Sequence, residues 1–274
     1  MQIAPLILGR NHMKNVVITG STRGIGLEMA KEFLKSGCNV TISGRSDIIS
    51  ATLLERLKGY ADKYQYVSCN VKEQSEIETL WMQAADKWGR IDIWINNAGQ
   101  NCPHEYCYDT ATTYVDSVID TNIKGMIYGS QTAAKNMLIQ GGGQICNMEG
   151  LGSNDMIQEK TILYGTTKRA LTYFTKGLAR ELNGTSVKAV RLSPGMMLTD
   201  FITKTPDGDE SPVIKEKNFK FIFNVLADIP ETVAAFFVPR ILNNTKNDAH
   251  VVWLTNIKTI WRFLKIPFVK RNLI

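Results

Sequence analysis

Short apolar runs alternate along the chain with segments in which apolar residues recur at helical spacing. One such segment extends from Leu27 to Lys35 and stops before Gly37, a typical helix end. Another begins at Ser75 and carries Glu76 in its first turn, where the helix dipole favours an acidic side chain. The strand-like runs are residues 16–19, 39–43, 66–69, 91–96, 144–147, 186–192 and 250–255. This alternation predicts an α/β fold: a single Rossmann-type, doubly wound parallel sheet with helices on both faces.

No break in composition, low-complexity linker or internal repeat divides the chain, so we expect one domain over residues 13–256. Within it, the sequence TPDGDESP at residues 205–212 is typical of a loop, and we expect a substrate flap at about 200–225. Residues 1–12 precede a methionine that lies directly before a strand, and they are expected to be a disordered N-terminal extension. Residues 257–274 form a basic, amphipathic C-terminal tail.

The composition is that of an ordinary globular protein and excludes several classes. Of the 274 residues, 44% are hydrophobic and 21% are charged, which allows a sizeable core. No apolar run approaches the roughly 18 residues that a transmembrane helix needs. Five cysteines without paired short spacing argue against a disulfide scaffold, and three scattered histidines argue against a metal site. Because the thiols are expected to be reduced and no signal peptide is evident, we expect a cytoplasmic protein.

The first strand runs into a glycine-rich turn, TGSTRGIG, which a helix follows. Glycines let the backbone approach a pyrophosphate closely, and the first amides of the helix then donate to the phosphates. A purely structural turn is the alternative for the glycines alone, but the strand before the turn and the helix after it argue against that alternative. The residues assigned to phosphate binding are Gly20, Ser21, Thr22, Arg23, Gly24, Ile25 and Gly26.

The end of the second strand indicates which dinucleotide binds. A site selective for NAD carries a carboxylate there, which binds the ribose 2′-hydroxyl. This chain has Arg45 and Ser46 instead, and its first acid, Asp47, comes later. A 2′-phosphate would meet these groups and the guanidinium of Arg23, which are charge-assisted donors. We therefore predict NADP(H) as cofactor, with two solvated surface arginines as the alternative.

Tyr164 and Lys168 form a Y-x-x-x-K pattern that stacks both side chains on one helix face. A carbonyl reduced by hydride needs a proton on its oxygen, and positive charge near a tyrosine lowers its pKa from ~10 towards neutrality. Asn122 falls on the apolar stripe of an earlier helix, where its amide must find partners. It is either satisfied by local backbone or holds a water in a proton relay towards Lys168.

Two further turns follow strands at their carboxyl ends, where open parallel sheets bind ligands. The sequence NNAG follows the fourth strand, and its small residues let a cofactor ring approach. The sequence SPGMMLT follows the sixth strand, and its threonine is suited to hold the nicotinamide amide or a phosphate. Either motif alone is also compatible with a plain turn. The residues assigned to cofactor binding here are Asn97, Ala98, Gly99, Pro194, Gly195, Met197 and Thr199, together with Tyr164 and Lys168.

TGSTRGIG, NNAG, Asn122, YGTTK and SPGMMLT occur in the order and spacing of the short-chain dehydrogenase/reductase family, which the chain resembles over residues 14–255. The resemblance implies a nicotinamide cofactor, a small-molecule carbonyl or alcohol substrate, and a homodimer or homotetramer. It implies that Tyr164 is the acid/base and that Lys168 binds ribose and tunes Tyr164. By the same resemblance Asn122 supports the relay, and Asn70 and Val71 lie beside the adenine.

The family usually places a serine after the fifth strand to hold the substrate oxygen, and this chain departs from that pattern. Glu149, Gly150 and Leu151 occupy the region, and Ser153 follows. Either Ser153 takes the role or the donor is missing, and losing one such donor costs ~10²–10³ in rate. The segment NMEGLGS before YGTTK is similar to the chlorophyll b reductase branch of the family.

The combined expectation is an NADPH-dependent carbonyl reductase, reversibly an alcohol dehydrogenase, in which Tyr164 donates the proton. Its substrate is expected to be a bulky apolar carbonyl, with a formyl tetrapyrrole and a ketosteroid as the two options. The alternative is a catalytically weak NADP(H)-binding sensor or scaffold, because the usual serine is displaced.

The C-terminal tail accounts for most of the net charge of +6, because no acidic residue follows Asp248. Its apolar residues share one helical face and its basic residues lie away from that face. Three interpretations stay open: packing on its own domain or a partner subunit, a weak peripheral contact with an anionic membrane, and, least favoured, nucleic acid. The rest of the chain is near neutral, so we expect no nucleic-acid partner.

Overall fold

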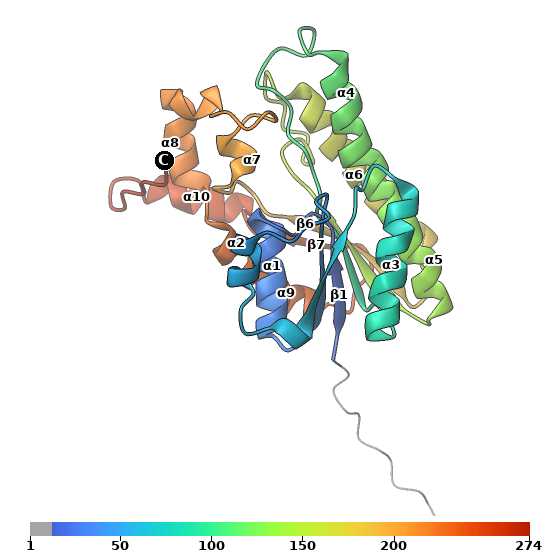
Figure 1. Ribbon diagram of the computed structural model, residues 1–274. Coiled ribbons are helices and arrows are strands. Elements are labelled where there is room, and N and C mark those ends of the chain that lie inside the picture. Colours follow the sequence, from blue (N-terminus) through green and yellow to red (C-terminus); the bar gives the residue numbers. More distant parts are fainter. Residues whose placement is uncertain (1–12) are drawn as a thin grey trace, which may run out of the picture.

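The computed structural model describes residues 13–274, and the predicted N-terminal extension, residues 1–12, lies outside the described residues. Within the described part, seven strands form one parallel sheet in the order β3-β2-β1-β4-β5-β6-β7 (Figure 1). The strands are β1 Asn15–Ile18, β2 Asn39–Gly44, β3 Tyr64–Ser68, β4 Ile93–Asn96, β5 Gly143–Met148, β6 Val187–Ser193 and β7 Ala249–Val252. The predicted doubly wound parallel sheet is therefore confirmed.

Helices cover both faces of the sheet. The α-helices are α1 Gly24–Lys35, α2 Ala51–Arg56, α3 Gln74–Trp88, α4 Thr112–Ile119, α5 Gly125–Ile139, α6 Ile162–Glu181, α7 Asp200–Thr203, α8 Lys217–Leu226, α9 Pro230–Leu242 and α10 Asn256–Leu264. Two 3₁₀ helices, η1 Ala61–Lys63 and η3 Pro212–Lys215, and a π-helical turn, η2 Asp120–Lys124, complete the set. Among the described residues, no helix combines the length and apolar character needed to cross a bilayer.

Two hydrophobic layers hold the helices on the sheet. On one face α1 and α9 pack on the strands, and their aromatic side chains Phe33 and Phe237 are fully buried. On the other face α3 and α5 pack around Trp81 and Trp94 (Figure 1). Because all strands of the sheet are parallel, their carboxyl ends meet along a single edge, where the loops that carry the predicted motifs gather.

The strand order reverses between β1 and β4, which is where a doubly wound sheet opens a crevice. Val16 of β1 lies opposite Val40 of β2 on one side and Ile93 of β4 on the other. At the end of β1, the amide of Thr19 donates to the carbonyl oxygen of Ile95 at 3.0 Å. The glycine-rich turn and the NNAG turn therefore leave the sheet next to each other.

The predicted flap contains α7, η3 and α8, joined by the loop at residues 204–211. These elements and α10 lie together beyond the carboxyl edge of the sheet (Figure 1). Strand β7 ends at Val252, three residues before the predicted end. The amide of Trp253 still donates to the carbonyl oxygen of Ser193 at 2.9 Å, after which the chain turns into α10.

A chain of polar side chains crosses the interior and joins β4, β5 and α6. The indole nitrogen of Trp94 donates to Asn96 Oδ1 at 2.8 Å, and Asn96 Nδ2 donates to Asn147 Oδ1 at 2.8 Å. Asn147 Nδ2 then donates to Thr175 Oγ1 at 2.9 Å. Because these groups are buried, each needs its partner, and the network fixes the helix against the two strands.

Two helical glycines provide a matched test of this packing. A methyl group on Gly129 of α5 would collide with Asn96 Oδ1 and come within 3.0 Å of the Trp94 indole nitrogen, whereas one on Gly177 of α6 would meet nothing within 4 Å. We expect Gly129→Ala to lower the free energy of unfolding by about 1–3 kcal/mol through overpacking. Gly177→Ala should raise it by about 0.5–1 kcal/mol, because alanine costs less helix entropy. Urea denaturation of both variants measures the difference, and equal effects would contradict the packing.

Candidate active site

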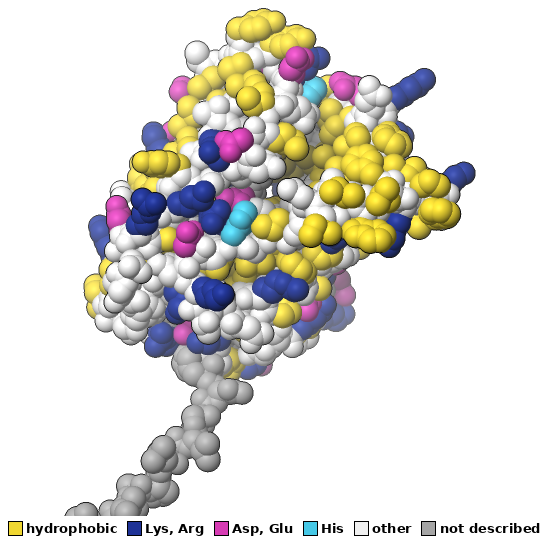
Figure 2. All heavy atoms as spheres, turned by 180° about the vertical axis from the view of Figure 1, so that it is seen from behind, with side chains coloured by type: hydrophobic (Ala, Val, Ile, Leu, Met, Phe, Trp, Pro, Cys, Tyr) yellow, Lys and Arg dark blue, Asp and Glu magenta, His cyan; other side chains and the backbone are white. Residues whose placement is uncertain are grey.

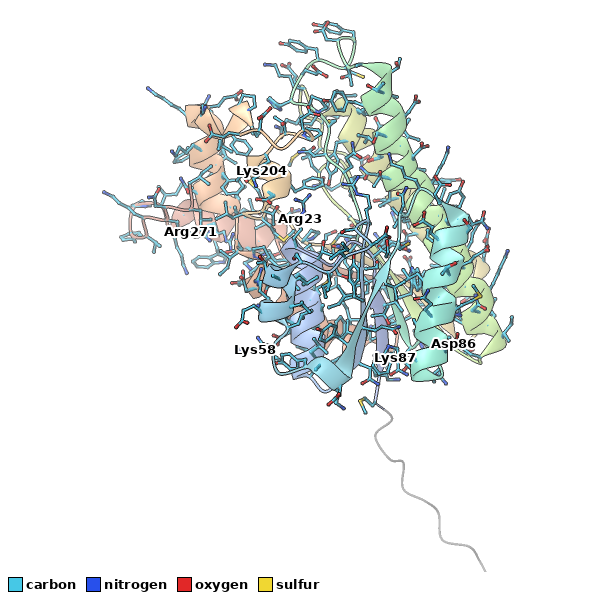
Figure 3. All side chains as sticks on the ribbon, in the orientation of Figure 1. Arg23, Lys58, Asp86, Lys87, Lys204 and Arg271 are labelled. Atoms are coloured by element: carbon cyan, nitrogen blue, oxygen red, sulfur yellow. The ribbon has the colours of Figure 1, made fainter. Side chains whose placement is uncertain are left out.

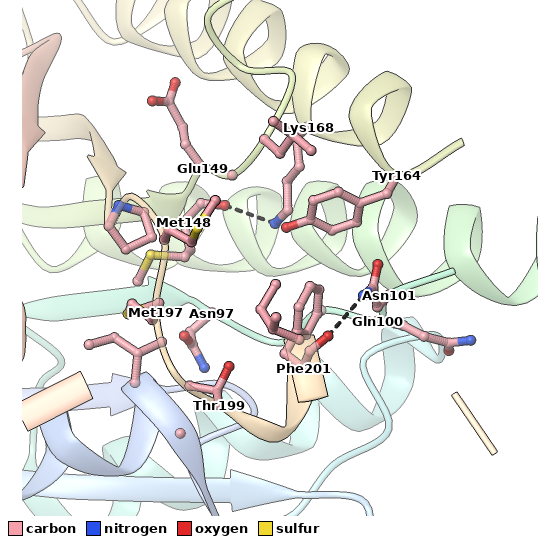
Figure 4. A pocket seen from close by; sticks show the side chains of 18 of the residues that line it. Asn97, Gln100, Asn101, Met148, Glu149, Tyr164, Lys168, Met197, Thr199 and Phe201 are labelled. Atoms are coloured by element: carbon pink, nitrogen blue, oxygen red, sulfur yellow. Dashed lines mark hydrogen bonds between the residues drawn. The ribbon is translucent and has the colours of Figure 1, made fainter. Parts of the chain in front are cut away.

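A cleft of about 2170 Å³ runs along the carboxyl ends of the strands. Every predicted site residue contributes to its wall except Ser21 and Asn122. The cleft therefore brings together motifs that lie far apart in the sequence, from the turn after β1 to the turn after β6. Close to its centre lie the side chains of Tyr164 and Lys168, with Phe201 facing them (Figure 4).

The glycine-rich turn packs closely on the NNAG turn and presents the start of helix α1 to the cleft. Gly20 and Gly24 have φ angles of +61° and +57°, which favour glycine, and a methyl group on Gly20 would lie 2.8 Å from Ala98 Cα. Helix α1 begins at Gly24, and neither a capping side chain nor an acidic residue occupies its first turn. Its first amides and its positive dipole end thus suit the pyrophosphate of a dinucleotide.

Ser21 lies behind this turn and holds it in place. Its hydroxyl donates to the carbonyl oxygen of Ile18 at 2.6 Å and accepts from the amide of Ser43 at 3.0 Å. Asn97 Nδ2 binds the same turn from β4, donating to Gly20 O at 2.9 Å. These contacts give Ser21 an observed place between β1 and β2, while its predicted role in phosphate binding stays a prediction.

The residues assigned to the 2′-phosphate lie on the rim of the cleft. Arg45 and Ser46 are exposed after β2, and the Ser46 hydroxyl donates to Ile48 O at 2.9 Å within its own loop. Arg23 lies beneath the flap (Figure 3), and its guanidinium is 3.6 Å from the carboxylate of Asp200. The arginines are thus available to an anion at the cleft, and Arg23 also links the turn to α7.

Asn70 and Val71 follow β3, on the same side of the cleft. The amide of Asn70 donates to Glu76 Oε2 at 2.7 Å, and its own side-chain oxygen accepts from the amide of Lys72 at 3.3 Å. Val71 is buried against Gly125 at the start of α5. The structure places both residues on the cleft wall, where the family resemblance implied contact with an adenine.

Tyr164 and Lys168 lie one turn apart on α6 and point into the cleft (Figure 4). Lys168 Nζ donates to the carbonyl oxygen of Met148, the last residue of β5, at 3.1 Å, and lies 5.7 Å from the centre of the Tyr164 ring. Burial lowers the pKa of Lys168 to about 8, against an opposing effect of Glu149. Burial raises the pKa of Tyr164, and Cys102 adds to this rise.

From the sequence we expect positive charge, from Lys168 and from oxidised nicotinamide when bound, to lower the pKa of Tyr164 towards neutrality. In the protein alone burial has the larger effect, so the residues by themselves raise the pKa of Tyr164, and the lowering with bound nicotinamide stays a prediction. Tyr164 therefore keeps its proton at neutral pH, which is the state that a proton donor needs.

Two neighbours of Tyr164 fix its position. The ring of Phe201 from α7 packs edge-on against it, with ring centres 5.4 Å apart. A methyl group on Gly150 would collide with the Tyr164 hydroxyl, so the bare backbone there lets the hydroxyl approach. Asn101 Nδ2 donates to Phe201 O at 2.8 Å and fastens α7 to the wall of the cleft (Figure 4). The sequence predicted a flap but did not single out Phe201.

Asn122 is buried in the π-helical turn η2, behind the cleft wall. Its Oδ1 accepts from the amide of Gln100 at 2.7 Å, and its Nδ2 donates to Gln100 O at 2.9 Å and Thr167 Oγ1 at 3.1 Å. The side chain thus joins the loop after β4 to helix α6. The relay through a water stays a prediction.

Ser153 lies in the loop between β5 and α6. Its hydroxyl accepts from the amide of Gly150 at 3.1 Å and donates to the carbonyl oxygen of Lys168 at 3.3 Å. Both partners are backbone groups, so the hydroxyl is engaged in holding the loop against α6. Leu151 lines the cleft in the region where the family usually has its serine. Whether Ser153 also acts on a substrate stays a prediction.

The turn after β6 closes the cleft from the other side. Gly195 has a φ of +71°, and a methyl group on it would lie 2.7 Å from Leu254 Cβ. Thr199 faces the glycine-rich turn, since its Cγ2 lies 3.7 Å from where a Cβ on Gly24 would be. Pro194 and Met197 line the same wall.

Glu149 is a buried carboxylate beside Lys168 that the sequence argument did not assign to the site. Its oxygens accept from the hydroxyls of Ser193 and Thr172, the latter at 2.9 Å, and lie 2.9 Å from His250 Nε2. Burial alone would raise the pKa of Glu149, but the hydrogen bonds from His250 and Ser193 hold it below its ordinary value. Its partners come from α6, β6 and β7, so only the assembled fold reveals the cluster.

Across residues 13–274, no group of three or more His, Cys, Asp or Glu side chains is arranged to hold a metal ion.

Residues 14–210 match the family described as short chain dehydrogenase, and the chain belongs to that family. It is thus an oxidoreductase of the short-chain dehydrogenase/reductase type, as its motifs implied. A relative from rice (Oryza sativa subsp. japonica), named chlorophyll(ide) b reductase NOL, chloroplastic, is 35% identical over 270 residues, covering 94% of this chain and 76% of the relative. The resemblance to the chlorophyll b reductase branch is therefore confirmed.

Two solved structures with similar folds were determined with a nicotinamide dinucleotide. ElxO with NADP bound has a TM-score of 0.77 and 28% identity, covering 88% of this chain and 96% of that chain. The closed form of serine dehydrogenase complexed with NADP⁺ has a TM-score of 0.75 and 25% identity, covering 88% of this chain and 94% of that chain.

The carboxylate of Glu149 favours the charged form of Lys168. Glu149→Gln removes this negative charge, so the pKa of Lys168 should fall further below about 8. Titration of the Lys168 side-chain ¹⁵N signal with pH measures the change, with the signal assigned by its absence in Lys168→Met. Glu159→Gln, an exposed change in the same loop, should leave the pKa in place. A Lys168 pKa that is unchanged in Glu149→Gln would contradict the coupling.

Proposed function

We propose that the protein is an NADPH-dependent carbonyl reductase, reversibly an alcohol dehydrogenase. The observation that carries this proposal is that Tyr164 and Lys168 share one cleft with the glycine-rich turn and the two later turns. A proton donor and a dinucleotide cradle are the two parts that carbonyl reduction requires. When bound, the nicotinamide supplies the hydride.

The choice of NADP(H) is supported by the charge at the cleft rim. Arg45 and Ser46 follow β2 without a carboxylate at the strand end, and Arg23 of the glycine-rich turn lines the same cleft. Guanidinium groups form strong charge-assisted hydrogen bonds with phosphate. The two similar folds determined with NADP agree with this choice.

In the proposed reaction Tyr164 donates its hydroxyl proton to the carbonyl oxygen of the substrate. Burial raises the pKa of Tyr164, so the hydroxyl is protonated at neutral pH and is available for donation. The ammonium group of Lys168 then stabilises the phenolate that remains. Its hydrogen bond to Met148 O fixes the ammonium beside the ring, and Asn122 holds the adjoining loop and helix together.

The substrate we propose is a bulky apolar carbonyl, and a formyl tetrapyrrole in particular. The relative at 35% identity is named a chlorophyll(ide) b reductase. Apolar side chains of the flap, among them Phe201, Phe219 and Ile222, line the cleft and suit a large ring system. A ketosteroid has the same general character, but no relative reported above points to it.

A second candidate is a sensor or scaffold that binds NADP(H) with little catalysis. It is favoured by the hydroxyl of Ser153, which bonds to backbone groups, and by Leu151 in the region of the usual serine. If Ser153→Ala lowers the rate by about 10²–10³, the serine has moved and the reductase is supported. Tight NADP(H) binding by the wild type, without turnover on a broad carbonyl panel, would support the second candidate.

Removing the proposed proton donor tests the mechanism. Tyr164→Phe should lower turnover by about 10²–10⁴, the usual contribution of a general acid, because no other hydroxyl replaces it. NADPH affinity should stay nearly unchanged, since the ring that packs on Phe201 is retained. Turnover and a fluorescence titration with NADPH measure the two quantities. Wild-type activity in the variant would contradict the mechanism.

Reversing the charge at Arg45 tests the cofactor assignment. A charge-assisted hydrogen bond is worth about 1.5–3 kcal/mol, so Arg45→Asp should weaken NADPH binding about tenfold to a hundredfold. NADH, which lacks the phosphate, should bind as before or more tightly. Arg180→Asp, an exposed change elsewhere, is the control. A preference for NADH in the wild type would overturn the assignment.

A homodimer or homotetramer and a cytoplasmic location accompany this proposal as predictions. Light scattering of the purified protein measures the first, and microscopy of a fluorescent fusion in the source cell measures the second.

A further inference from the structure

Helix α10 carries its apolar side chains on the outside of the protein. Ile257, Trp261 and Leu264 lie on one helical face and are 70%, 58% and 61% exposed. Ile260 on the same face, Phe268 beyond the helix and Phe221 on α8 are exposed as well. We call these six side chains the apolar platform. Figure 2 shows hydrophobic side chains gathered over the part of the surface that α8 and α10 form.

Two arginine side chains of the tail face the rest of the protein and form ion pairs with it. Arg262 forms an ion pair with Asp228 and donates to Leu226 O at 2.6 Å. Arg271 binds the other oxygen of Asp228 at 2.8 Å and donates to Ala227 O at 2.6 Å. The carboxylate of Asp228 is buried and also accepts from the indole of Trp253.

This clamp prevents the tail from burying its apolar face against its own domain. Turning α10 over would break the contacts of Arg262 and remove an ionic partner from the buried carboxylate of Asp228, which is costly. The tail therefore packs on its own domain through its polar face, and its apolar face is left for a partner subunit or a membrane. A cluster of large exposed apolar side chains is typical of a surface that binds another protein or a membrane.

The charged residues near the apolar platform favour a lipid bilayer over a second copy of the chain as its partner. Lys217 and Lys220 are exposed on α8, the helix that carries Phe221, and Lys265 and Lys270 are exposed in the tail on either side of Phe268 in the sequence. Two copies facing each other through this surface would bring like charges together. A layer that is apolar inside and negatively charged outside complements both features, as an anionic lipid bilayer does.

The apolar platform also adjoins the mouth of the cleft. Ile222 and Leu226 of α8 and Leu254 before α10 line the cleft, while their neighbours Phe221 and Ile257 belong to the platform. A surface that docks on lipid here brings the cleft opening to the level of the bilayer.

We propose that the apolar platform and its lysine rim form a docking surface for an anionic lipid bilayer. The contact is peripheral: apolar side chains enter the interfacial region, and the lysines lie at the lipid phosphates. This inference does not rest on the proposed reductase activity, because it concerns a surface outside the cleft.

The test is flotation of the full chain with vesicles. Wild-type protein should bind vesicles of phosphatidylglycerol and phosphatidylcholine, bind pure phosphatidylcholine far less, and lose binding as salt is raised. The double change Ile257→Ser and Trp261→Ser should weaken binding at least tenfold. The control double change Leu54→Ser and Ile139→Ser, at exposed apolar positions on α2 and α5, should leave binding in place.

A charge variant tests the lysine rim without touching the apolar side chains. Each lysine near an anionic surface contributes about 1 kcal/mol, so Lys265→Glu with Lys270→Glu should weaken binding to anionic vesicles at least tenfold. Thermal unfolding and NADPH binding of every variant report whether the fold is intact. If the serine variant is unfolded, the charge variant and the dependence of binding on salt test whether the surface binds anionic lipid.

Two results would overturn the proposal. In the first, vesicles do not bind, and light scattering shows that the wild type is an oligomer and that the variant with serine at both Ile257 and Trp261 is a monomer. This result would identify a second copy of the chain as the partner of the surface. Absence of vesicle binding with no change in oligomeric state would show that neither lipid nor a second copy covers the surface.

Discussion

A buried ammonium group is the constraint on which the rest of the site depends. Lys168 is 4% exposed, and its charge is tolerated because Nζ donates to the carbonyl oxygen of Met148 at the end of β5 and lies near the carboxylate of Glu149. Both partners follow from the parallel sheet, which ends β5 at the cleft. Tyr164 lies one turn earlier on the same helix, so that fixing Lys168 also fixes the hydroxyl proposed to donate the proton. The hydrogen bond from Lys168 to Met148 O thus joins the sheet to helix α6 and positions the proposed proton donor.

The cleft is assembled from short turns, each of which is held by the neighbouring strand. Asn97 binds the turn after β1, Asn101 binds the flap, and Asn122 binds the loop after β4 to α6. In each case the side-chain amide nitrogen donates to a group of another segment and so joins the two segments. At the far end the clamp at Asp228 uses arginines in the same manner and leaves the apolar face of α10 outside. A single architecture therefore positions both the proposed chemistry and the proposed lipid contact.

Local signals in the sequence predicted the parts that one segment determines. Alternating apolar runs predicted the sheet, and the glycine-rich turn, Tyr164 and Lys168 were predicted from spacing. Glu149 was missed because its partners come from three separate elements, and Phe201 was missed because the register of the flap has no periodic signal. For the protein alone the pKa of Tyr164 rises and does not fall, because the extent of its burial is set by tertiary packing. Helical spacing showed that α10 is amphipathic, but only the contacts of Arg262 and Arg271 with Asp228 show which face is outside.

The most direct measurement of the central claim is product analysis with NADPH and a formyl tetrapyrrole. The account predicts that the formyl carbon and oxygen each gain one hydrogen, that one NADPH is consumed for each product molecule, and that Lys168→Met abolishes the reaction. Mass spectrometry of the pigment, with absorbance of NADPH followed in parallel, measures both. Tight NADPH binding by the wild type without reduction of this or any other bulky carbonyl would contradict the account.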